Sequence, residues 1–254
     1  MTVVLIPQEK LTVGFDTCKD QIITLLSDSR TLYDSRKFAS SITLSILAHE
    51  EVGKLNIIRI HILGKKDITK KEWDNISKPG SHTFKSTAFY NIALEDLKKM
   101  GEEKYNKIIE KAKPLGIIHK PHKYSELLKH ESMMKQRFKT LNEIKKACLY
   151  VDWKDSEWFS ISKIYSEHEL SLLANYLLDL VGYELHSELL IYKYPLDFYY
   201  EVPPEASLMR KDPLWQKREE YSKRVYGDKE YSEFLKAVNY LIETFPKKSF
   251  KFVK

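Results

Sequence analysis

Residues 36–63, RKFASSITLSILAHEEVGKLNIIRIHIL, form the most apolar stretch of the chain. If this stretch is helical, apolar side chains fall on nearly every side of the helix between Phe38 and Leu63. A helix that is apolar all round is buried on all sides, so we expect it to run through the middle of a helical bundle. The charged side chains inside it, in the string LAHEEVGK (residues 47–54), then need buried partners.

The segments on either side of this stretch repeat their apolar residues every three or four positions, which is the period of a helix with one buried face. Such patterns predict helices at residues 16–33, 81–113, 125–149, 166–192, 214–226 and 230–245. Ser166 and Glu169 have the spacing of a capping box, and Thr69 can cap a short helix. We expect residues 36–63 and 81–113 to be antiparallel neighbours, and residues 149–162 to be extended or to turn.

The amino-acid composition also favours a helical fold. With 43% hydrophobic and 31% charged residues the chain is globular, and 8 Gly and 9 Pro among 254 residues are too few for the turns of an all-β domain. Four of the nine prolines lie in residues 195–213, which we expect to form a loop. The predicted fold is all-α, an up-and-down bundle over residues 1–194 followed by a loop and a helical hairpin over residues 195–254.

Several functional classes are excluded by what the sequence lacks. Two cysteines, Cys18 and Cys148, cannot build a disulfide framework or a thiolate zinc site. The opening apolar run VVLI is too short for a signal peptide, and no run of 18 uncharged apolar residues exists, so we expect a cytoplasmic protein that contacts no membrane. HExxH, Walker, GxGxxG and GxSxG motifs are absent, so neither a metal nor a cofactor is expected.

The string EEVGK carries the first group of candidate catalytic residues, which are Glu50, Glu51 and Lys54. Glu50 and Lys54 are four positions apart and therefore share one face of a helix. Charged groups at this spacing in an apolar helix are typical of a buried site, whereas the same spacing on a surface is an ordinary ion pair. The sequence leaves both interpretations open.

The string SHTFK carries the second group, His82 and Lys85. They are three positions apart at the expected start of the helix over residues 81–113, where unpaired backbone amides favour an anion such as a phosphate. The alternative is that Ser81 is only an N-cap and that both side chains belong to a solvated first turn.

Basic side chains in the tail alternate with aromatic ones, a mixture that suits phosphates and stacked bases. The candidate RNA-binding residues are Lys211, Lys217, Arg218, Lys223 and Arg224. The alternative is a solvated helix face. The net charge of 42 − 36 = +6 permits a polyanionic partner without requiring one.

The run LLSDSRTLYDSRKFASSITLSILAHEEVGK, followed by SHTFK and then by KKACLYVDW, resembles the AbiV family of abortive infection proteins, a branch of the HEPN-like helical domains. The resemblance covers residues 25–150 and the helix expected after Ser166, and it implies an antiphage toxin that forms a homodimer. It also implies a metal-independent endoribonuclease acting on cellular RNA and blocking translation, with Glu50, Glu51, Lys54, His82 and Lys85 as the catalytic residues. A phage-encoded activator protein is a candidate partner.

The chain departs from the usual HEPN ribonuclease motif, an arginine followed after four to six residues by a histidine. None of the seven arginines, at positions 30, 36, 59, 137, 210, 218 and 224, meets this spacing. The rival hypothesis is therefore a non-catalytic helical protein that binds a phage or host protein. The expected homodimer also has an argument of its own, because the apolar stretch over residues 36–63 would leave surface for a partner.

Overall fold

The computed structural model describes residues 4–77, 98–112, 123–150, 152–154, 157–194, 211–226 and 236–242. Its strands are β1 (Val4–Ile6), β2 (Ile68–Thr69), β3 (Asp152–Lys154) and β4 (Glu157–Phe159). Its labelled helices are α1 (Gln8–Asp34), α2 (Phe38–Leu63), α3 (Lys70–Ser77), α5 (Glu102–Ala112), α6 (Tyr124–Leu149), α7 (Ile161–Ile164), α8 (Glu167–Lys193) and α10 (Pro213–Tyr226). Residues 236–242 are also helical.

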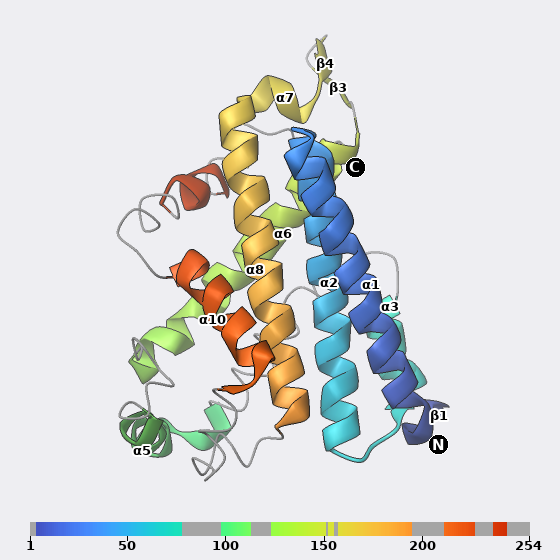
Figure 1. Ribbon diagram of the computed structural model, residues 1–254, viewed down its shortest axis with the longest axis vertical. Coiled ribbons are helices and arrows are strands. Elements are labelled where there is room, and N and C mark those ends of the chain that lie inside the picture. The colour runs from blue at the N-terminus through green and yellow to red at the C-terminus, as the bar shows by residue number, and fades with distance from the viewer. Residues whose placement is uncertain are drawn as a thin grey trace.

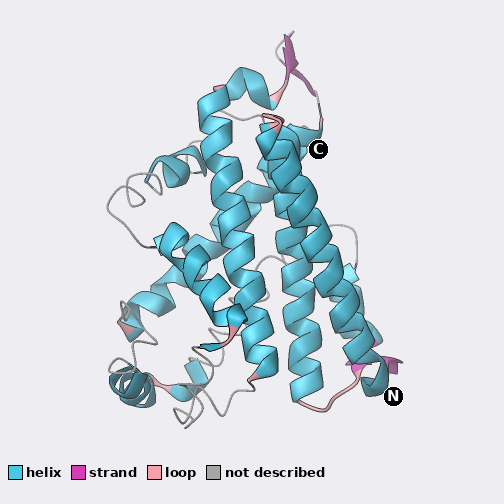
Figure 2. Ribbon diagram, in the orientation of Figure 1, coloured by secondary structure: helices cyan, strands magenta, loops and turns pink. Residues whose placement is uncertain are grey.

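The fold is all-α, as predicted, with two short antiparallel strand pairs, β1 with β2 and β3 with β4 (Figure 2). In Figure 1, α1 and α2 run antiparallel beside α8, α6 crosses behind them, and α10 lies on the other side of α8. Helices α2 and α8 run in the same direction (Figure 1), and α3, α5, α6 and α7 come between them in the chain.

The apolar helix α2 is central, as its sequence predicts. It packs against α1, α6 and α8, and 16 of its 26 residues are buried. The homodimer expected from this apolar stretch remains a prediction. Two hydrophobic clusters cover α2, one around Ile42 and Leu177 and the other around Leu55 and Val181.

The first helix begins at Gln8 and not at Asp16, where the sequence pattern placed it. Leu11 and Phe15 continue the buried stripe towards the N-terminus, each only 1% exposed, and Pro7 stands at the N-cap. Proline fixes its own φ and lacks an N–H, so it suits the start of a helix. Ile23 is 49% exposed although it is apolar, because the buried stripe passes through Ile22.

Other local predictions are confirmed. Ser166 and Glu169 form the capping box at the start of α8, and the Thr69 hydroxyl accepts a hydrogen bond from the amide of Glu72 at the start of α3. Residues 152–159 contain the β3–β4 pair. Gly101 has a φ of +77° and interrupts the helix expected over residues 81–113, since a left-handed residue cannot continue an α-helix. Much of that helix and its pairing with residues 36–63 lie outside the described residues.

The C-terminal part of the described chain rests on the bundle. Helix α10 packs along α8, where Tyr221 lies against Gly182: a Cβ at Gly182 would be 2.4 Å from Tyr221 Cε1. Residues 236–242 add Val238, Leu241 and Ile242 to the first hydrophobic cluster. The domain boundary expected at residue 195 remains a prediction.

Candidate functional site

The LAHEEVGK turn of α2 directs consecutive side chains to different neighbours. His49 meets α8, Glu50 meets α6, and Glu51 pairs with Lys54 on α2 itself. Adjacent residues of an α-helix differ by about 100° in direction, so three consecutive side chains of a central helix must face different elements. The motif thus lies where α2, α6 and α8 come together.

Glu50 forms an ion pair with Lys145 of α6, and both side chains are almost completely buried, at 4% and 6% exposed. The charge pattern predicted that Lys54 or Lys85 would hold Glu50 or Glu51; for Glu50 the structure shows Lys145, and Lys85 lies outside the described residues. A carboxylate that faces the core needs a cation from the element opposite, and α6 supplies it. Lys54 lies on the same helix face by spacing, yet it bends to Glu51.

The pair of Glu51 and Lys54 confirms that one carboxylate of the motif is held by Lys54. Their atoms Oε2 and Nζ are 2.6 Å apart, and both side chains are about four-fifths buried. The pair lies close to Cys18 of α1. Burial raises the pKa of the Cys18 thiol, the charge of Glu51 raises it further, and Lys54 opposes both. Such a thiol is poorly reactive at neutral pH, so Cys18 is not a candidate nucleophile.

Two buried pairs between α2 and α8, one of histidine with glutamate and one of arginine with glutamate, were missed by the sequence analysis. His49 Nε2 lies 3.0 Å from Glu184 Oε2, and Arg59 Nε lies 2.7 Å from Glu188 Oε2. Asn56 donates a second hydrogen bond to Glu188, at 3.0 Å. All of these side chains are 5% exposed or less, so each carboxylate is buried against its own partner from α2.

Burial is also the largest influence on the pKa of Glu188. It raises the pKa of that carboxyl, whereas Arg59 and the hydrogen bond from Asn56 lower it, and the nearby charge of Glu184 raises it. A signal for these pairs was present in the sequence: Glu184 and Glu188 are four apart and interrupt the apolar seam of residues 170–190. Carboxylates on the buried face of a helix indicate cationic partners, although not which ones.

Of the five candidate catalytic residues, the structure brings Glu50, Glu51 and Lys54 to this region. His82 and Lys85 lie outside the described residues. Within the described part of the chain, no three His, Cys, Asp or Glu side chains gather closely enough to hold a metal ion. The described helices include none that is both long enough and apolar enough to span a membrane.

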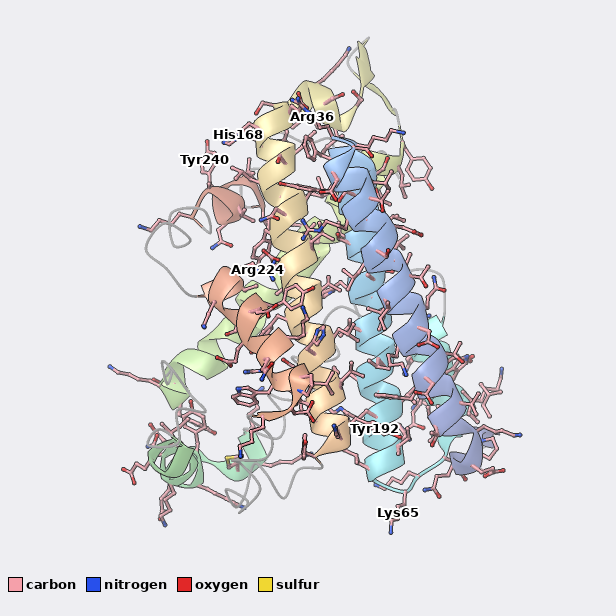
Figure 3. The ribbon with its side chains drawn as sticks, in the orientation of Figure 1. Arg36, Lys65, His168, Tyr192, Arg224 and Tyr240 are labelled. Atoms are coloured by element: carbon pink, nitrogen blue, oxygen red, sulfur yellow. The ribbon has the colours of Figure 1, made fainter. Side chains whose placement is uncertain are left out.

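The five basic residues of the tail have different roles in the structure. Arg218 is held against α8: it donates hydrogen bonds to Ser187 and to the hydroxyl of Tyr183, and its guanidinium lies over the rings of Tyr183 and Trp215. Arg224, labelled in Figure 3, approaches the buried Asp179 at 3.4 Å.

The three lysines of the tail, by contrast, are exposed. Lys211 and Lys223 are both on the surface, and Lys217 is on the surface as well, 3.4 Å from Glu220. These three side chains are therefore available to an anionic partner, whereas Arg218 is already occupied.

The family model for HEPN_AbiV, described as AbiV, matches residues 10–176. The chain belongs to the AbiV family of HEPN-like proteins. The matched range spans α1 to the first part of α8 and includes the LAHEEVGK turn, whereas Glu184, Glu188 and α10 follow it. No curated protein matches the chain. No solved structure matches it either.

Proposed function

We propose that this AbiV protein is an abortive-infection toxin that cleaves cellular RNA in the cytoplasm without a metal ion and so blocks translation. The observation that carries the proposal is the composition of the segment from His49 to Lys54 in α2. This segment lies inside the region matched by the family and holds an imidazole beside Glu184, a carboxylate paired with Lys145, and a carboxylate and an ammonium group paired with each other. Proton carriers beside fixed charge are what RNA cleavage requires.

The chemistry is an attack of a ribose 2′-OH on the adjacent phosphorus. The new O2′–P bond forms as the P–O5′ bond breaks, one group takes the 2′-OH proton, and another gives a proton to the leaving O5′. The products are a 2′,3′-cyclic phosphate and a 5′-OH end. His82 is the proposed proton donor, Glu51 a second proton-transfer group, and Lys54 and Lys85 supply positive charge to the phosphorane. DNA lacks the hydroxyl and should be spared.

The test is cleavage of total cellular RNA by the purified protein in the presence of a chelator, with the fragment ends mapped. We expect cyclic phosphate and 5′-OH ends, no cleavage of DNA of the same sequence, and loss of both cleavage and toxicity in His82→Ala. Intact RNA at protein concentrations that arrest growth would overturn the proposal.

A second candidate function is the non-catalytic interaction protein. Two observations favour it: no arginine–histidine spacing of the usual HEPN motif occurs, and Glu50 and Lys145 are buried against one another. In that case growth arrest should persist in His82→Ala, and wild-type protein should leave RNA intact.

The exposed lysines of the tail are the proposed RNA-binding residues, with Arg224 beside them. Replacing Lys211, Lys217 and Lys223 by Gln should weaken RNA binding and make it less dependent on salt, by about one unit of slope for each phosphate that the tail no longer neutralises. Arg218→Gln is the matched control, because Arg218 is held by Tyr183 and Ser187. An unchanged salt slope in the triple variant would remove the tail from RNA binding.

The proposed partners are a second copy of the chain, RNA and a phage-encoded activator protein. Light scattering tests the homodimer directly: a mass of 30.0 kDa at all micromolar concentrations would contradict it.

A further inference from the structure

A cavity of about 440 Å³ lies at the end of the bundle where α2 and α8 both begin. One wall is the connection from α1 to α2 with the first turn of α2, residues 36–40, and the other is made by residues between 162 and 170, from α7 into α8. In Figure 1 both segments lie at the end of the bundle that carries α7. The volume falls in the range of small-molecule sites, about 300–1,000 Å³.

The charged side chains that line this cavity are all accessible. Arg36, Lys37 and Glu167 are exposed. Arg36 uses only Nε for its hydrogen bond to Glu167, at 2.8 Å, so both Nη groups of the guanidinium keep their donors. No described residue forms an ion pair or a hydrogen bond with the Lys37 ammonium group. With two cations and one carboxylate, the lining favours an anion.

The two helices that begin at the cavity differ at their N-termini. The N-cap of α8, Ser166, forms the capping box with Glu169. The N-cap of α2 is Lys37, whose side chain accepts no hydrogen bond from the first turn. The first amides of α2 therefore add donors and the positive end of the helix dipole beside Arg36 and Lys37. The cavity and its cations define the site, and the start of α2 strengthens it.

Apolar side chains form much of the remaining lining, which includes Phe38, Tyr165 and Leu170. A phosphate ion alone leaves such a wall unused. A nucleotide uses both parts, because its base lies against aromatic and aliphatic side chains while its phosphate meets the cations. The hydroxyls of Ser40 and Ser162 also line the cavity and suit the hydroxyls of a ribose.

We propose that this cavity binds a nucleoside monophosphate, either free or as the phosphorylated 5′ end of an RNA chain. A phosphate monoester carries about two negative charges near neutrality, which matches Arg36 and Lys37. Glu167 holds the Arg36 side chain at the rim and limits the positive charge there. The site uses neither the segment from His49 to Lys54 nor the tail, so the proposal does not rest on the proposed function.

The first experiment is a calorimetric titration of the full chain with AMP, and with ribose 5-phosphate and inorganic phosphate as partial ligands. We expect AMP to bind at least about fivefold more tightly than either, because only AMP carries a base for the apolar wall. Arg36→Gln and Lys37→Gln should each weaken AMP binding at least about fivefold. Glu167→Gln should tighten it about twofold, because it removes a negative charge beside the phosphate.

Lys65→Gln is the matched control. Lys65 is also an exposed cation with a left-handed backbone, with a φ of 49° against 59° for Arg36, but it lies at the opposite end of α2 (Figure 3). It should bind AMP within about twofold of wild type. Equal losses in Lys65→Gln and Lys37→Gln would overturn the proposal, and so would the absence of saturable binding up to about 10 mM AMP.

The second experiment distinguishes the two sources of the nucleotide. It compares 2′-O-methyl RNA oligonucleotides that differ only in a 5′-phosphate or a 5′-hydroxyl and that attack by a 2′-OH cannot cleave. If the cavity takes an RNA end, the phosphorylated oligonucleotide binds more tightly, and Lys37→Gln removes the difference. Equal binding of the two, with AMP still bound, assigns the cavity to the free nucleotide.

Circular dichroism of each variant checks that the helices are intact. None of these measurements depends on cleavage of RNA. Wild-type protein that leaves RNA intact but binds AMP in this cavity would therefore overturn the proposed function and leave the nucleotide site standing. Wild-type protein that cleaves RNA but binds no AMP would do the reverse.

Discussion

The two sides of α8 are built differently. Towards α2 the helix presents Glu184 and Glu188, whose ion pairs are 5% exposed or less. Towards α10 it presents Asp179, Tyr183 and Lys193, whose partners on or beside α10 include Arg224, 47% exposed, and Arg218, 21% exposed. Water screens the pairs on the α10 side and not those on the α2 side. Breaking a pair on the α2 side should therefore cost more stability than breaking one on the α10 side.

The largest effect is expected from the α2 side. Arg59→Ala leaves Glu188 buried with only Asn56 as a partner, and an uncompensated buried charge costs about 3–5 kcal/mol. Urea unfolding followed by circular dichroism measures the loss. The double variant Arg59→Met/Glu188→Met, which removes both charges, should recover more than half of it, and a loss below about 1 kcal/mol in Arg59→Ala would show that water reaches this pair.

On the α10 side the largest loss of stability should come from a steric clash. A Cβ at Gly182 would lie 2.4 Å from Cε1 of Tyr221, so Gly182→Ala must push the Tyr221 ring away from α8. Overpacking of this kind costs about 1–3 kcal/mol, but here it should loosen α10 alone. Hydrogen exchange should therefore rise in residues 213–226 and not in α2. Adding Tyr221→Ala removes the clash, and exchange in α10 that stays slow in Gly182→Ala would contradict the prediction.

A smaller effect, with a pH dependence, is expected at Asp179. Burial raises the pKa of this carboxyl above its ordinary value of 3.8, while Arg224 and Arg30 oppose the rise. The folded protein then binds the proton more tightly than the unfolded chain, so this group lowers stability as the pH rises through the shifted pKa. Asp179→Asn should raise the unfolding temperature at pH 7 relative to wild type, with the difference disappearing below pH 3.8. A variant less stable than wild type at pH 7 would show that the pairing with Arg224 outweighs burial.

The smallest effect should come from Lys193. Its Nζ lies 2.6 Å from Asp212 Oδ2, but the lysine is 54% exposed, and Asp212 also accepts hydrogen bonds from the Tyr194 hydroxyl and the Leu214 amide. Lys193→Ala should change the unfolding free energy by less than about 0.5 kcal/mol. Thermal unfolding at low and high salt measures it, and a loss above about 1 kcal/mol would remove the contrast between the two sides of α8.

Much of the fold could be predicted because it depends on contacts between residues close in the sequence or on the pattern of apolar side chains. The capping box at Ser166 needs only residues three apart, and the burial of α2 follows from apolar side chains on all its faces. The start of α1 was misplaced because the pattern that includes Leu11 and Phe15 was not extended back to Pro7.

The candidate site was only partly predictable. The sequence singled out Glu50, Glu51 and Lys54, but spacing along one helix suggested Lys54 as the partner of Glu50. Spacing describes neighbours on the same helix and says nothing of the element opposite, which is where a core-facing carboxylate finds its cation. Arg218 shows the same limit, since a basic residue in a tail gives no sign that Tyr183 and Ser187 will hold it.

By itself, the sequence determined an all-α protein around one apolar helix, its AbiV family and the motif that carries its charges. These depend on composition and on periods of a few residues, which the chain displays directly. Only the tertiary structure decided that Glu50 meets Lys145, His49 meets Glu184 and Arg59 meets Glu188, pairs that are 95, 135 and 129 positions apart in the chain. The packing of α2 against α6 and α8 brings them together, and burial then makes each charge depend on its partner.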